Sequence, residues 1–391
     1  MRAGNRKRTG NRKRTGNGKK EWLAPFKVLF HSFLASLNII LVILLIVSAY
    51  SGMISPEKYV LFAYLGLVFP ILIFANICFF AYWAITKKWL FVSILTLAFA
   101  VCWTPISRYC PFHFKTEVLP REDVIKVLSY NVMSFAYKDH TEKSPNKIIQ
   151  YIAESGADIV CLQEYMVSSR PNLMSSEKVA GALPMYPYMA EIIFSPPENN
   201  RYKYGLAVLS RFPITKSRRI VFPSAYNGAS IHEIMVGGKK IVLVNNHLES
   251  FKLTAEDRSR YSDMITRASF ESFDGLRGSI QQKLGQAFRI RAKQAESVAD
   301  EIRKANGRHT IVCGDFNDTP VSYAHRTIQG SLSDAYAQSG FGMGTSYNRN
   351  FFLFRIDHIL YSPGMEAYNC TVDTRVNLSD HYPIYCYLKI N

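Results

Sequence analysis

The apolar residues of the chain are distributed in two different ways. Ahead of residue 107 they form three long runs without Asp, Glu, Lys or Arg, namely Val28–Tyr50, Tyr59–Ile85 and Trp89–Ile106. A run of about 20 apolar residues is long enough for a helix to cross the hydrocarbon core of a bilayer. The pattern therefore predicts about three transmembrane helices over residues 28–106, and the third run is the shortest.

Basic residues beside these runs predict how the helices are oriented. The first run follows a tail rich in Lys and Arg, and Lys87 and Lys88 lie between the second and third runs. Because Lys and Arg favour the cytoplasmic side, both regions are expected there. Three crossings then place the C-terminal domain outside the cytoplasm, in an integral protein of the inner or plasma membrane. If the third run only lies at the interface, the domain stays inside.

After a linker at residues 107–123, short apolar runs alternate with polar turns up to residue 391. Alternating runs predict strands, and a spacing of three to four residues predicts helices. The expected strands are Val124–Val132, Asp158–Leu162, Gly205–Leu209, Ile231–Val236, Ile241–Val244, Thr310–Cys313, Ile356–Tyr361 and Ile384–Ile390, and the expected helices are Asn146–Glu154 and Phe288–Ala305. This order predicts an α/β fold, a two-sheet α-β-β-α four-layer sandwich over residues 124–391.

Residues 253–285 match no simple element in this pattern. A long segment without regular structure in a compact domain is usually a functional loop or an insertion. We interpret it as an insertion over one rim of the domain, either a lid or a membrane-facing loop.

The net charge of +17 suggests nucleic-acid binding until it is located along the chain. Nine Lys and Arg residues lie within the first 20 positions, and subtracting them leaves +8 for the rest. Residues 1–27 carry a repeated Gly-Asn-Arg-Lys-Arg-Thr motif, which cannot bury apolar surface and is expected to be a disordered cytoplasmic tail. We interpret the tail as a topology signal, with lipid-headgroup or nucleic-acid contact as the alternative.

The candidate chemistry lies where the apolar strands end. An acid, amide or imidazole follows six of them: Asn131, Glu164, Asn246 with His247, Asp315 with Asn317, Asp357 with His358, and Asp380 with His381. Strand ends at one rim of a layered fold commonly build the site, whereas a single polar residue there is more often a cap or turn. The seven cysteines show no metal-binding spacing and predict no disulfide framework.

These residues lie in motifs that resemble the endonuclease/exonuclease/phosphatase family. In chain order the motifs are Leu-Ser-Tyr-Asn131, Gln163-Glu164, the Ser-Arg-Phe-Pro that ends at Pro213, Gly-Asp315-Phe-Asn317, Ile-Asp357-His-Ile, and Ser-Asp380-His381-Tyr-Pro. Each short motif is weak alone, but the ordered set is specific. The resemblance covers about residues 124–391, and the family includes deoxyribonucleases, abasic-site endonucleases, neutral sphingomyelinases and inositol-polyphosphate 5-phosphatases.

The resemblance implies a metal-dependent phosphoesterase. Phosphoester hydrolysis needs a hard cation on a nonbridging oxygen, an activated water and stabilisation of the leaving oxygen. We expect Glu164, Asn131 and Asp380 to hold Mg²⁺, with Mn²⁺ as a possible substitute, because hard cations favour oxygen ligands.

The remaining residues receive catalytic roles from the same resemblance. We expect Asp315 to orient and deprotonate the attacking water, with Asn317 holding the phosphate or Asp315 itself. His381 is expected to bind the scissile phosphate, with Asp357 orienting its ring. His358 should point the opposite way along its strand and is interpreted as structural.

His247 occupies the position where deoxyribonuclease-like and sphingomyelinase-like members carry a second histidine. This counts against an abasic-site enzyme. We expect His247 to contact phosphate or protonate the leaving group, while Asn246 is interpreted as a turn residue. No acid that would orient His247 is evident, and Glu191 and Glu233 are only candidates.

The sequence thus predicts a membrane-anchored, metal-dependent phosphoesterase in which water attacks a phosphodiester or phosphomonoester in line. The expected partners are a lipid bilayer and a phosphoester substrate, which could be a lipid headgroup, a nucleic acid or an inositol phosphate; no protein partner is evident. The alternatives are a surface-anchored nuclease and a catalytically silent membrane binding protein on the same fold.

Overall fold

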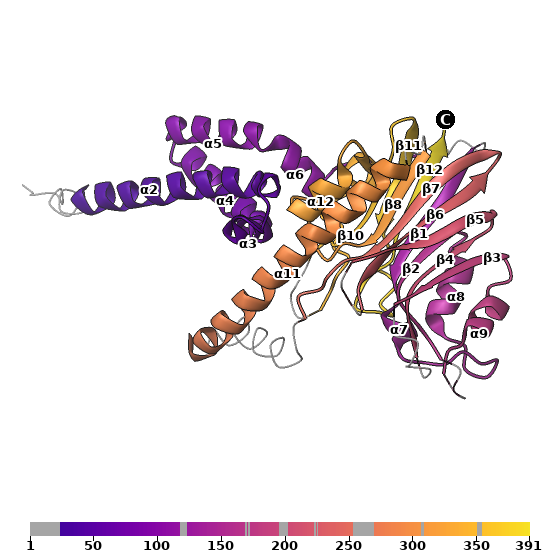
Figure 1. Ribbon diagram of the computed structural model, residues 1–391. Helices are drawn as coiled ribbons and strands as arrows, with labels where there is room; N and C mark the ends of the chain where they lie inside the picture. Colours follow the sequence, from indigo (N-terminus) through magenta and orange to yellow (C-terminus); the bar gives the residue numbers. More distant parts are fainter. Residues whose placement is uncertain are drawn as a thin grey trace, which may run out of the picture.

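The computed structural model describes residues 24–117, 123–168, 170, 173–194, 202–222, 224, 226–252, 270–305, 309–349 and 354–391. A group of apolar helices at the N-terminal end adjoins a larger domain built on β-sheets (Figure 1). Most of the tail that the sequence predicts to be disordered, and the first part of the predicted insertion, lie outside these ranges.

Two six-stranded sheets form the larger domain, as the sequence predicts. Their orders are β11-β12-β1-β2-β4-β3 and β5-β6-β7-β8-β10-β9. The strands of the first sheet are β1 (Val124–Asn131), β2 (Ile159–Val167), β3 (Tyr188–Ile193), β4 (Lys203–Ser210), β11 (Met365–Val372) and β12 (Ile384–Ile390). Those of the second are β5 (Ile214–Ile220), β6 (Gly228–Val236), β7 (Lys239–His247), β8 (His309–Asp315), β9 (Ser333–Asp334) and β10 (Asp357–Tyr361).

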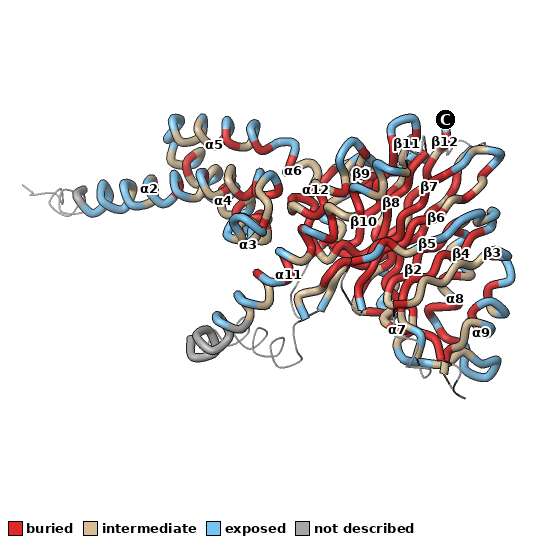
Figure 2. The backbone as a smooth tube through the Cα atoms, viewed as in Figure 1, coloured by how far each residue is buried: buried red, intermediate tan, exposed pale blue. Residues whose placement is uncertain are grey.

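Three apolar cores show that the domain has four layers. The central core lies between the sheets and contains Val127, Cys161, Ile311 and Ile384. A second core packs the outer face of the first sheet against helices α8 (Lys147–Glu154) and α9 (Ser176–Ala182). A third packs the second sheet against α11 (Phe270–Ala305) and α12 (Tyr323–Gln329). The α/β four-layer sandwich predicted from the sequence is therefore confirmed, and Figure 2 shows the continuous buried interior.

The apolar N-terminal region forms five helices and a short 3₁₀ turn. They are α2 (Ala24–Ala49), η1 (Ser51–Met53), α3 (Val60–Leu67), α4 (Phe69–Ile85), α5 (Trp89–Val101) and α6 (Trp103–Tyr109). Among the described residues, α2 alone is by itself long and apolar enough to span a membrane, over Phe26–Ala49. The pairs α3–α4 and α5–α6 qualify only if each bent pair counts as one span, with bends of 57° and 66°.

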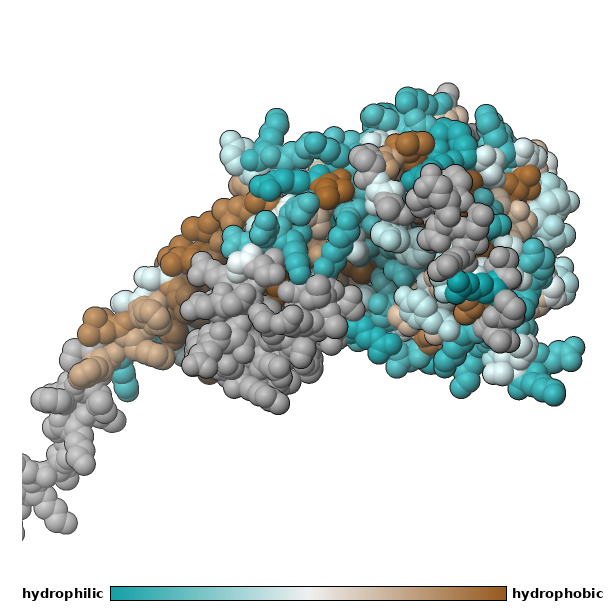
Figure 3. Space-filling model, turned by 60° about the horizontal axis from the view of Figure 1, so that its bottom comes forward, coloured by the Kyte–Doolittle hydropathy of each residue, from teal (hydrophilic) through white to brown (hydrophobic). Residues whose placement is uncertain are grey.

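The bends explain why the three apolar runs of the sequence correspond to one long helix and two bent helix pairs. Pro70 lies in the first turn of α4, and Pro105 lies in the first turn of α6. Proline lacks the N–H that would continue a helix, so a helix bends or restarts there. Many large apolar side chains of α2 and α4 remain exposed, and they form an apolar surface in Figure 3.

The apolar helices contact the sheet domain at the end of α2 and at the end of α6, among other places. Gly52 of η1 packs against the backbone of Val321 and Ser322, and a side chain there would collide with their carbonyl oxygens. The guanidinium of Arg355 donates to the carbonyl oxygens of Arg108 and Tyr109 at the end of α6, at 2.6 and 3.3 Å. The ends of α2 and α6 therefore both meet the sheet domain.

Helix α11 is longer than the sequence suggests. The expected helix begins at Phe288, whereas α11 begins at Phe270, so residues 270–285 of the predicted insertion are helical. Gly275, Gly278 and Gly285 lower the helix propensity of this stretch and hide its periodicity. The prediction that residues 253–285 contain no regular element is wrong for this part.

Candidate active site

The site forms where two parallel strand pairs end side by side. Strand β1 runs parallel to β2, and β7 runs parallel to β8 with His247 opposite Asp315. Strand β10 is antiparallel to β8 and places Asp357 opposite Asp315 as well. The ends of parallel strands lie at one edge of a sheet, so the polar residues that follow them converge.

A β-bulge positions Glu164. The pairing of β2 with β4 shifts between Leu162 and Tyr165, and Glu164 has a φ of +50°. A bulge leaves its extra residue unpaired and redirects the side chain. The carboxylate of Glu164 accepts a hydrogen bond from the side-chain amide of Asn131 at 3.2 Å.

Asn131 connects the two sheets at the site. Its amide also donates to Oδ2 of Asp315 at 3.1 Å, and its Oδ1 accepts from the backbone N–H of Met133 at 3.1 Å. The amide nitrogen, and not the oxygen, therefore faces the carboxylates. In this arrangement Asn131 holds Glu164 and Asp315 together.

Asp315 is buried at the centre of the site. Its Oδ1 accepts from the backbone N–H of Asn317 at 2.8 Å. The side chain of Asn317 donates to the carbonyl oxygen of Leu248 at 2.9 Å. Burial raises the pKa of Asp315 to about 6, with His381 and His247 acting against the rise and Asp357 adding to it. Near neutral pH its carboxylate can accept a proton.

His381 is held between two carboxylates. Its Nδ1 lies 2.8 Å from Oδ2 of Asp357, and its Nε2 lies 3.6 Å from Oδ2 of Asp315. Burial opposes the charged form, but the carboxylates of Asp357 and Asp315 outweigh it and raise the pKa of His381 well above its ordinary value. In its protonated form His381 would direct one N–H to Asp357 and the other toward the site.

His247 lies across the site from His381. Its Nε2 is 3.8 Å from both Oε1 of Glu164 and Oδ2 of Asp315, and its Nδ1 is buried without a hydrogen-bond partner. Burial lowers the pKa of His247, partly offset by Asp315.

Neither acid proposed to orient His247 has a contact with it among the described interactions. Glu191 accepts a hydrogen bond from the Tyr165 hydroxyl, and Glu233 forms an ion pair with Lys240 at 3.7 Å. The amide of Asn227 approaches Nε2 of His247 at 3.4 Å instead.

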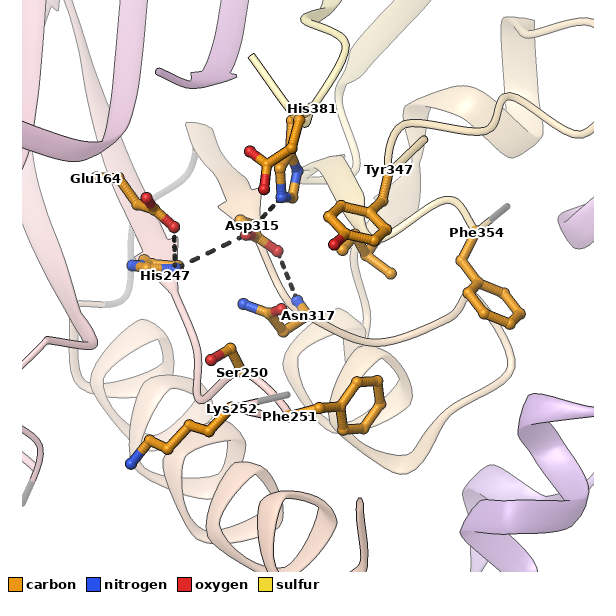
Figure 4. Close-up of a pocket in the computed structure, with 12 residues that line it drawn as sticks. Glu164, His247, Ser250, Phe251, Lys252, Asp315, Asn317, Tyr347, Phe354 and His381 are labelled. Carbon is orange, nitrogen blue, oxygen red and sulfur yellow. Dashed lines mark hydrogen bonds and ion pairs between the residues drawn. The ribbon is translucent and has the colours of Figure 1, made fainter. Parts of the chain in front are cut away.

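These side chains surround one cavity, shown in Figure 4. Its lining consists of Glu164, His247, Ser250, Phe251, Lys252, Asp315, Asn317, Tyr347, Phe354, Ile356, Asp380 and His381. Six of the eight residues predicted from the sequence line it. The other two, Asn131 and Asp357, contact Asp315 and His381 from behind. Of the remaining strand-end residues, Asn246 and His358 donate to the backbone oxygens of Cys313 and Asp318.

The cavity fits a divalent cation. The carboxylates of Glu164, Asp315 and Asp380 line it. Lys252 is the single Lys or Arg in the described lining, and it is already paired with Glu249. Converging carboxylates repel one another unless a cation or a proton compensates them. Glu164 and Asp380 lie at the cavity surface, where oxygen ligands, water and a substrate phosphate can share a hard cation.

Asp315, Asp357 and His381 also lie close enough together to bind a metal ion. Their contacts favour a different interpretation. The 2.8 Å hydrogen bond between Nδ1 of His381 and Oδ2 of Asp357 already occupies one ring nitrogen and one carboxylate oxygen of this group. We therefore interpret this group as an acid–imidazole–acid chain.

A second buried group, His325, Asp334 and His358, lies apart from the cavity. Asp334 accepts from His325 at 3.1 Å and caps the helix α13 (Ala335–Ser339) through two backbone N–H groups. Burial acts to raise the pKa of Asp334, but the hydrogen bond with His325 and the nearby positive charge of Arg355 outweigh it and lower the pKa. A neighbouring guanidinium disfavours a bound cation, so the group is explained as a structural network.

The apolar side of the cavity is not predicted by the sequence pattern. Phe251, Tyr347 and Phe354 face it from segments between the regular elements, where no periodicity marks them. Tyr347 packs edge-on against His381 with ring centroids 5.1 Å apart. Ser379 belongs to the Ser-Asp-His-Tyr-Pro motif but received no role from the sequence; its hydroxyl donates to the carbonyl oxygen of Asn131 at 2.8 Å and joins the two motifs. A small polar residue before Asp380-His381 was the available signal.

Comparison with known proteins identifies a family match over the sheet domain. The Endonuclease/Exonuclease/phosphatase family matches residues 128–381. A Domain of unknown function (DUF8431) matches residues 31–109, the apolar helices. No curated protein shows significant similarity to the chain.

Several solved structures resemble the sheet domain at low sequence identity. An endonuclease/exonuclease/phosphatase from Beutenbergia cavernae DSM 12333 is 16% identical, with a TM-score of 0.49 over 69% of this chain and 72% of that one. A family protein from Leptotrichia buccalis C-1013-b is 16% identical, with a TM-score of 0.47 over 68% and 100%. Sphingomyelinase C from Streptomyces griseocarneus is 17% identical, with a TM-score of 0.44 over 68% and 99%.

Proposed function

Because the chain belongs to the Endonuclease/Exonuclease/phosphatase family, we propose that it is a membrane-anchored hydrolase that cleaves a phosphoester by metal-assisted attack of water. Members of this family act on phosphoesters and typically use a divalent metal ion. The observation that carries the proposal is the cavity, where Glu164, Asp315, Asp380, His247 and His381 meet from different strands and loops.

Glu164 and Asp380 would hold the metal ion, with Mg²⁺ as the first choice. Asn131 would keep the Glu164 carboxylate in place through its 3.2 Å hydrogen bond and supply a ligand oxygen only if its amide turned over. A bound Mg²⁺ would polarise a phosphoryl oxygen and stabilise the charge that develops in the transition state. The chain's own residues supply the proton transfers.

Asp315 is the proposed general base. Its carboxylate is fixed by Asn131 and by the backbone N–H of Asn317, so one oxygen can take a proton from an attacking water. Asn317 holds Asp315 through its backbone N–H, while its side chain donates to the carbonyl oxygen of Leu248.

The two histidines are proposed to act on the phosphoryl oxygens. His381, positively charged between Asp357 and Asp315, offers its Nε2–H to a phosphate oxygen. His247 presents Nε2 to the other side of the cavity, where it can contact the phosphate or protonate the leaving oxygen. Asp357 touches His381 from behind and acts as a positioning residue.

Hydrolysis of bis(p-nitrophenyl) phosphate by the full-length protein in detergent tests this function. We expect release of p-nitrophenol with Mg²⁺ or Mn²⁺ and its loss with a chelator. Activity that persists with chelator would contradict the metal assignment. Absence of activity with either ion on this diester and on a matched monoester would contradict the hydrolase proposal and favour a silent binding protein.

We also propose three membrane passages, with the catalytic domain at residues 124–391 outside the cytoplasm and residues 107–123 as the linker. Helix α5 alone has 13 residues, about 20 Å, which is shorter than the hydrocarbon core, so the third passage needs α6 as well. Support comes from the contacts of η1 and α6 with the sheet domain. Because η1 follows the first passage and the end of α6 follows the third, three passages place both on the same side of the membrane as that domain. In Figure 1, α2 and α5 both run toward that domain.

A topology reporter tests this arrangement. Alkaline phosphatase fused after residue 115, which is active only outside the cytoplasm, should be active, and the same fusion after Lys88 should be inactive. Inactivity of both fusions would show that the third passage does not cross, and the reverse activities would show that the orientation of all three passages is inverted.

A further inference from the structure

The catalytic cavity has a polar side and an aromatic side. Figure 4 shows Glu164 and His247 on one side and Phe251 and Phe354 on the other. The aromatic side has no role in phosphate chemistry, since its rings offer no charge to a phosphoryl oxygen. It is suited to the part of a substrate that flanks the phosphate.

Phe251 connects the aromatic side to the second apolar passage. Its ring packs edge-on against Phe288 at 5.5 Å, and Phe288 packs edge-on against Tyr64 of α3 at 5.6 Å. The Tyr64 hydroxyl donates to the backbone oxygen of Gln281 in α11 at 2.5 Å. Three aromatic rings thus run without interruption from the cavity to a helix of the apolar region.

Phe354 is connected to the third passage. The next residue, Arg355, is buried and donates to the carbonyl oxygens of Arg108 and Tyr109 at the end of α6. Both aromatic residues are therefore linked to helices of the proposed membrane region, Phe251 through Phe288 and Tyr64, and Phe354 through its neighbour Arg355. The wall is continuous with the side of the domain from which a bilayer lipid would arrive.

The charge of the cavity argues against a polyanion. Nucleic-acid binding draws its affinity from Lys and Arg placed along a phosphate backbone. Within the described lining, Lys252 is the one Lys or Arg, and it is paired with Glu249. Three carboxylates line the cavity beside aromatic side chains, an arrangement that suits one phosphate with a metal ion and an apolar neighbour.

From these contacts we propose that the substrate is a phosphoester carried by a membrane lipid, with the glycerol- or acyl-proximal part of the lipid lying against Phe354 and Phe251. This inference rests on the proposed phosphoesterase function. The lipid would reach the cavity from the bilayer beside α3 and α6, so the anchored domain would act on the membrane in which it is held.

Two synthetic diesters that differ only in their alkyl group provide the test. Methyl p-nitrophenyl phosphate and hexadecyl p-nitrophenyl phosphate release the same leaving group, and the full-length protein in phosphatidylcholine vesicles with Mg²⁺ is the enzyme. We expect the hexadecyl ester to be preferred. The hexadecyl ester also concentrates in the bilayer, which by itself raises its rate of cleavage. We therefore compare the preference for this ester between protein variants, because the ester partitions into the bilayer equally for each variant.

Phe354→Ala removes one ring from the aromatic wall, and Phe341→Ala is the matched control. Phe341 is 57% exposed and packs against Phe112 and Phe114, outside the cavity. Loss of a buried ring contact should lower the hexadecyl-to-methyl ratio of kcat/KM by about tenfold in Phe354→Ala. Phe341→Ala should leave both rates and their ratio at the parent values.

The outcomes separate the inference from the function on which it rests. An unchanged ratio in Phe354→Ala, with both esters cleaved, would overturn the lipid inference and leave the phosphoesterase intact. Faster cleavage of plasmid DNA than of the hexadecyl ester would overturn it in favour of a nuclease. Failure to cleave any of these substrates with Mg²⁺ or Mn²⁺ would reject the proposed function, and the inference with it.

Discussion

Asp315 has more partners in the site than any neighbouring carboxylate, and its substitution is the most direct test of the mechanism. Asn131, Asn317, His247 and His381 all approach it within 3.8 Å. Asp315→Asn keeps the shape of the side chain but removes the proton acceptor. We expect kcat on bis(p-nitrophenyl) phosphate to fall by about 10²–10⁴-fold.

Asp300→Asn is the control for this substitution, because Asp300 lies on the exposed face of α11 and pairs only with Arg303 among its described contacts. Its rate should equal that of the parent protein. An Asp315→Asn protein with parental thermal stability and undiminished hydrolysis would rule out Asp315 as the base.

His232 makes the stability of the domain depend on pH. It is buried in β6 between the hydroxyls of Ser217 and Ser230, and burial lowers its pKa to about 4. An unfolded histidine titrates near pH 6.5, so in the unfolded chain His232 takes up a proton below that pH before the folded protein does. The free energy of unfolding is therefore at its full value above about pH 6.5. It decreases as the pH falls toward 4, by at most about 3 kcal/mol, because the unfolded chain binds a proton at His232 first.

Thermal unfolding near pH 7 and near pH 5 measures this effect. His232→Gln should show a smaller drop in Tm between the two conditions than the parent protein, since glutamine does not titrate. His113→Gln, at an exposed histidine, should keep the parental drop. Equal drops in all three proteins would show that His232 is not the group responsible.

At the scale of elements, the close pairing of β7 and β8 depends on a glycine. Gly314 has a φ of +128°, and a Cβ there would collide with the backbone of Asn246. The pairing holds His247 opposite Asp315. Gly314→Ala should therefore destabilise the domain by a few kcal/mol, on the order of other strained backbone substitutions, and lower hydrolysis with it.

Gly181→Ala provides the comparison for Gly314→Ala. Gly181 lies in helix α9 with open space around its Cα. Alanine favours the helix, so Tm should be unchanged or slightly higher. A Gly314→Ala protein that unfolds at the parental temperature would show that the two strands can separate at little cost.

The same elements show what could be predicted from the sequence. The buried strands β1, β2, β7 and β8 were predictable because their apolar runs are continuous and end in polar residues. Edge strand β5, Ile-Thr-Lys-Ser-Arg-Arg-Ile, was not, because four of its seven residues are exposed and its pattern is polar. The length of α11 was hidden by its glycines.

The residues of the site also fall into those that could be predicted from the sequence and those that could not. Residues in regular strands or directly after them were predictable, because strand periodicity and the family motifs place them. The orientation of Asn131, which turns its nitrogen toward two carboxylates, depends on atoms from both sheets and on the N–H of Met133. The aromatic wall depends on α11, α3 and α6 packing together, which local sequence does not encode.

For the whole molecule, the apolar helices are part of the architecture of the site. Arg355 stacks over Tyr336 at 4.2 Å and donates to the carbonyl oxygens of Arg108, Tyr109 and Met343. Two residues later, Asp357 orients His381. The backbone that positions the imidazole is thereby fixed to the end of α6.

Arg355→Met tests whether this connection matters for catalysis. Methionine fills similar space but leaves the three carbonyl oxygens without their donor, and each buried unsatisfied group costs about 1–3 kcal/mol. We expect a lower Tm and a lower kcat on bis(p-nitrophenyl) phosphate, with KM changed little, because Arg355 is absent from the cavity lining. Arg326→Met, at an exposed position of α12, is the control and should match the parent protein. If Arg355→Met lowers Tm while kcat stays at the parental value, the helices anchor the domain without positioning His381.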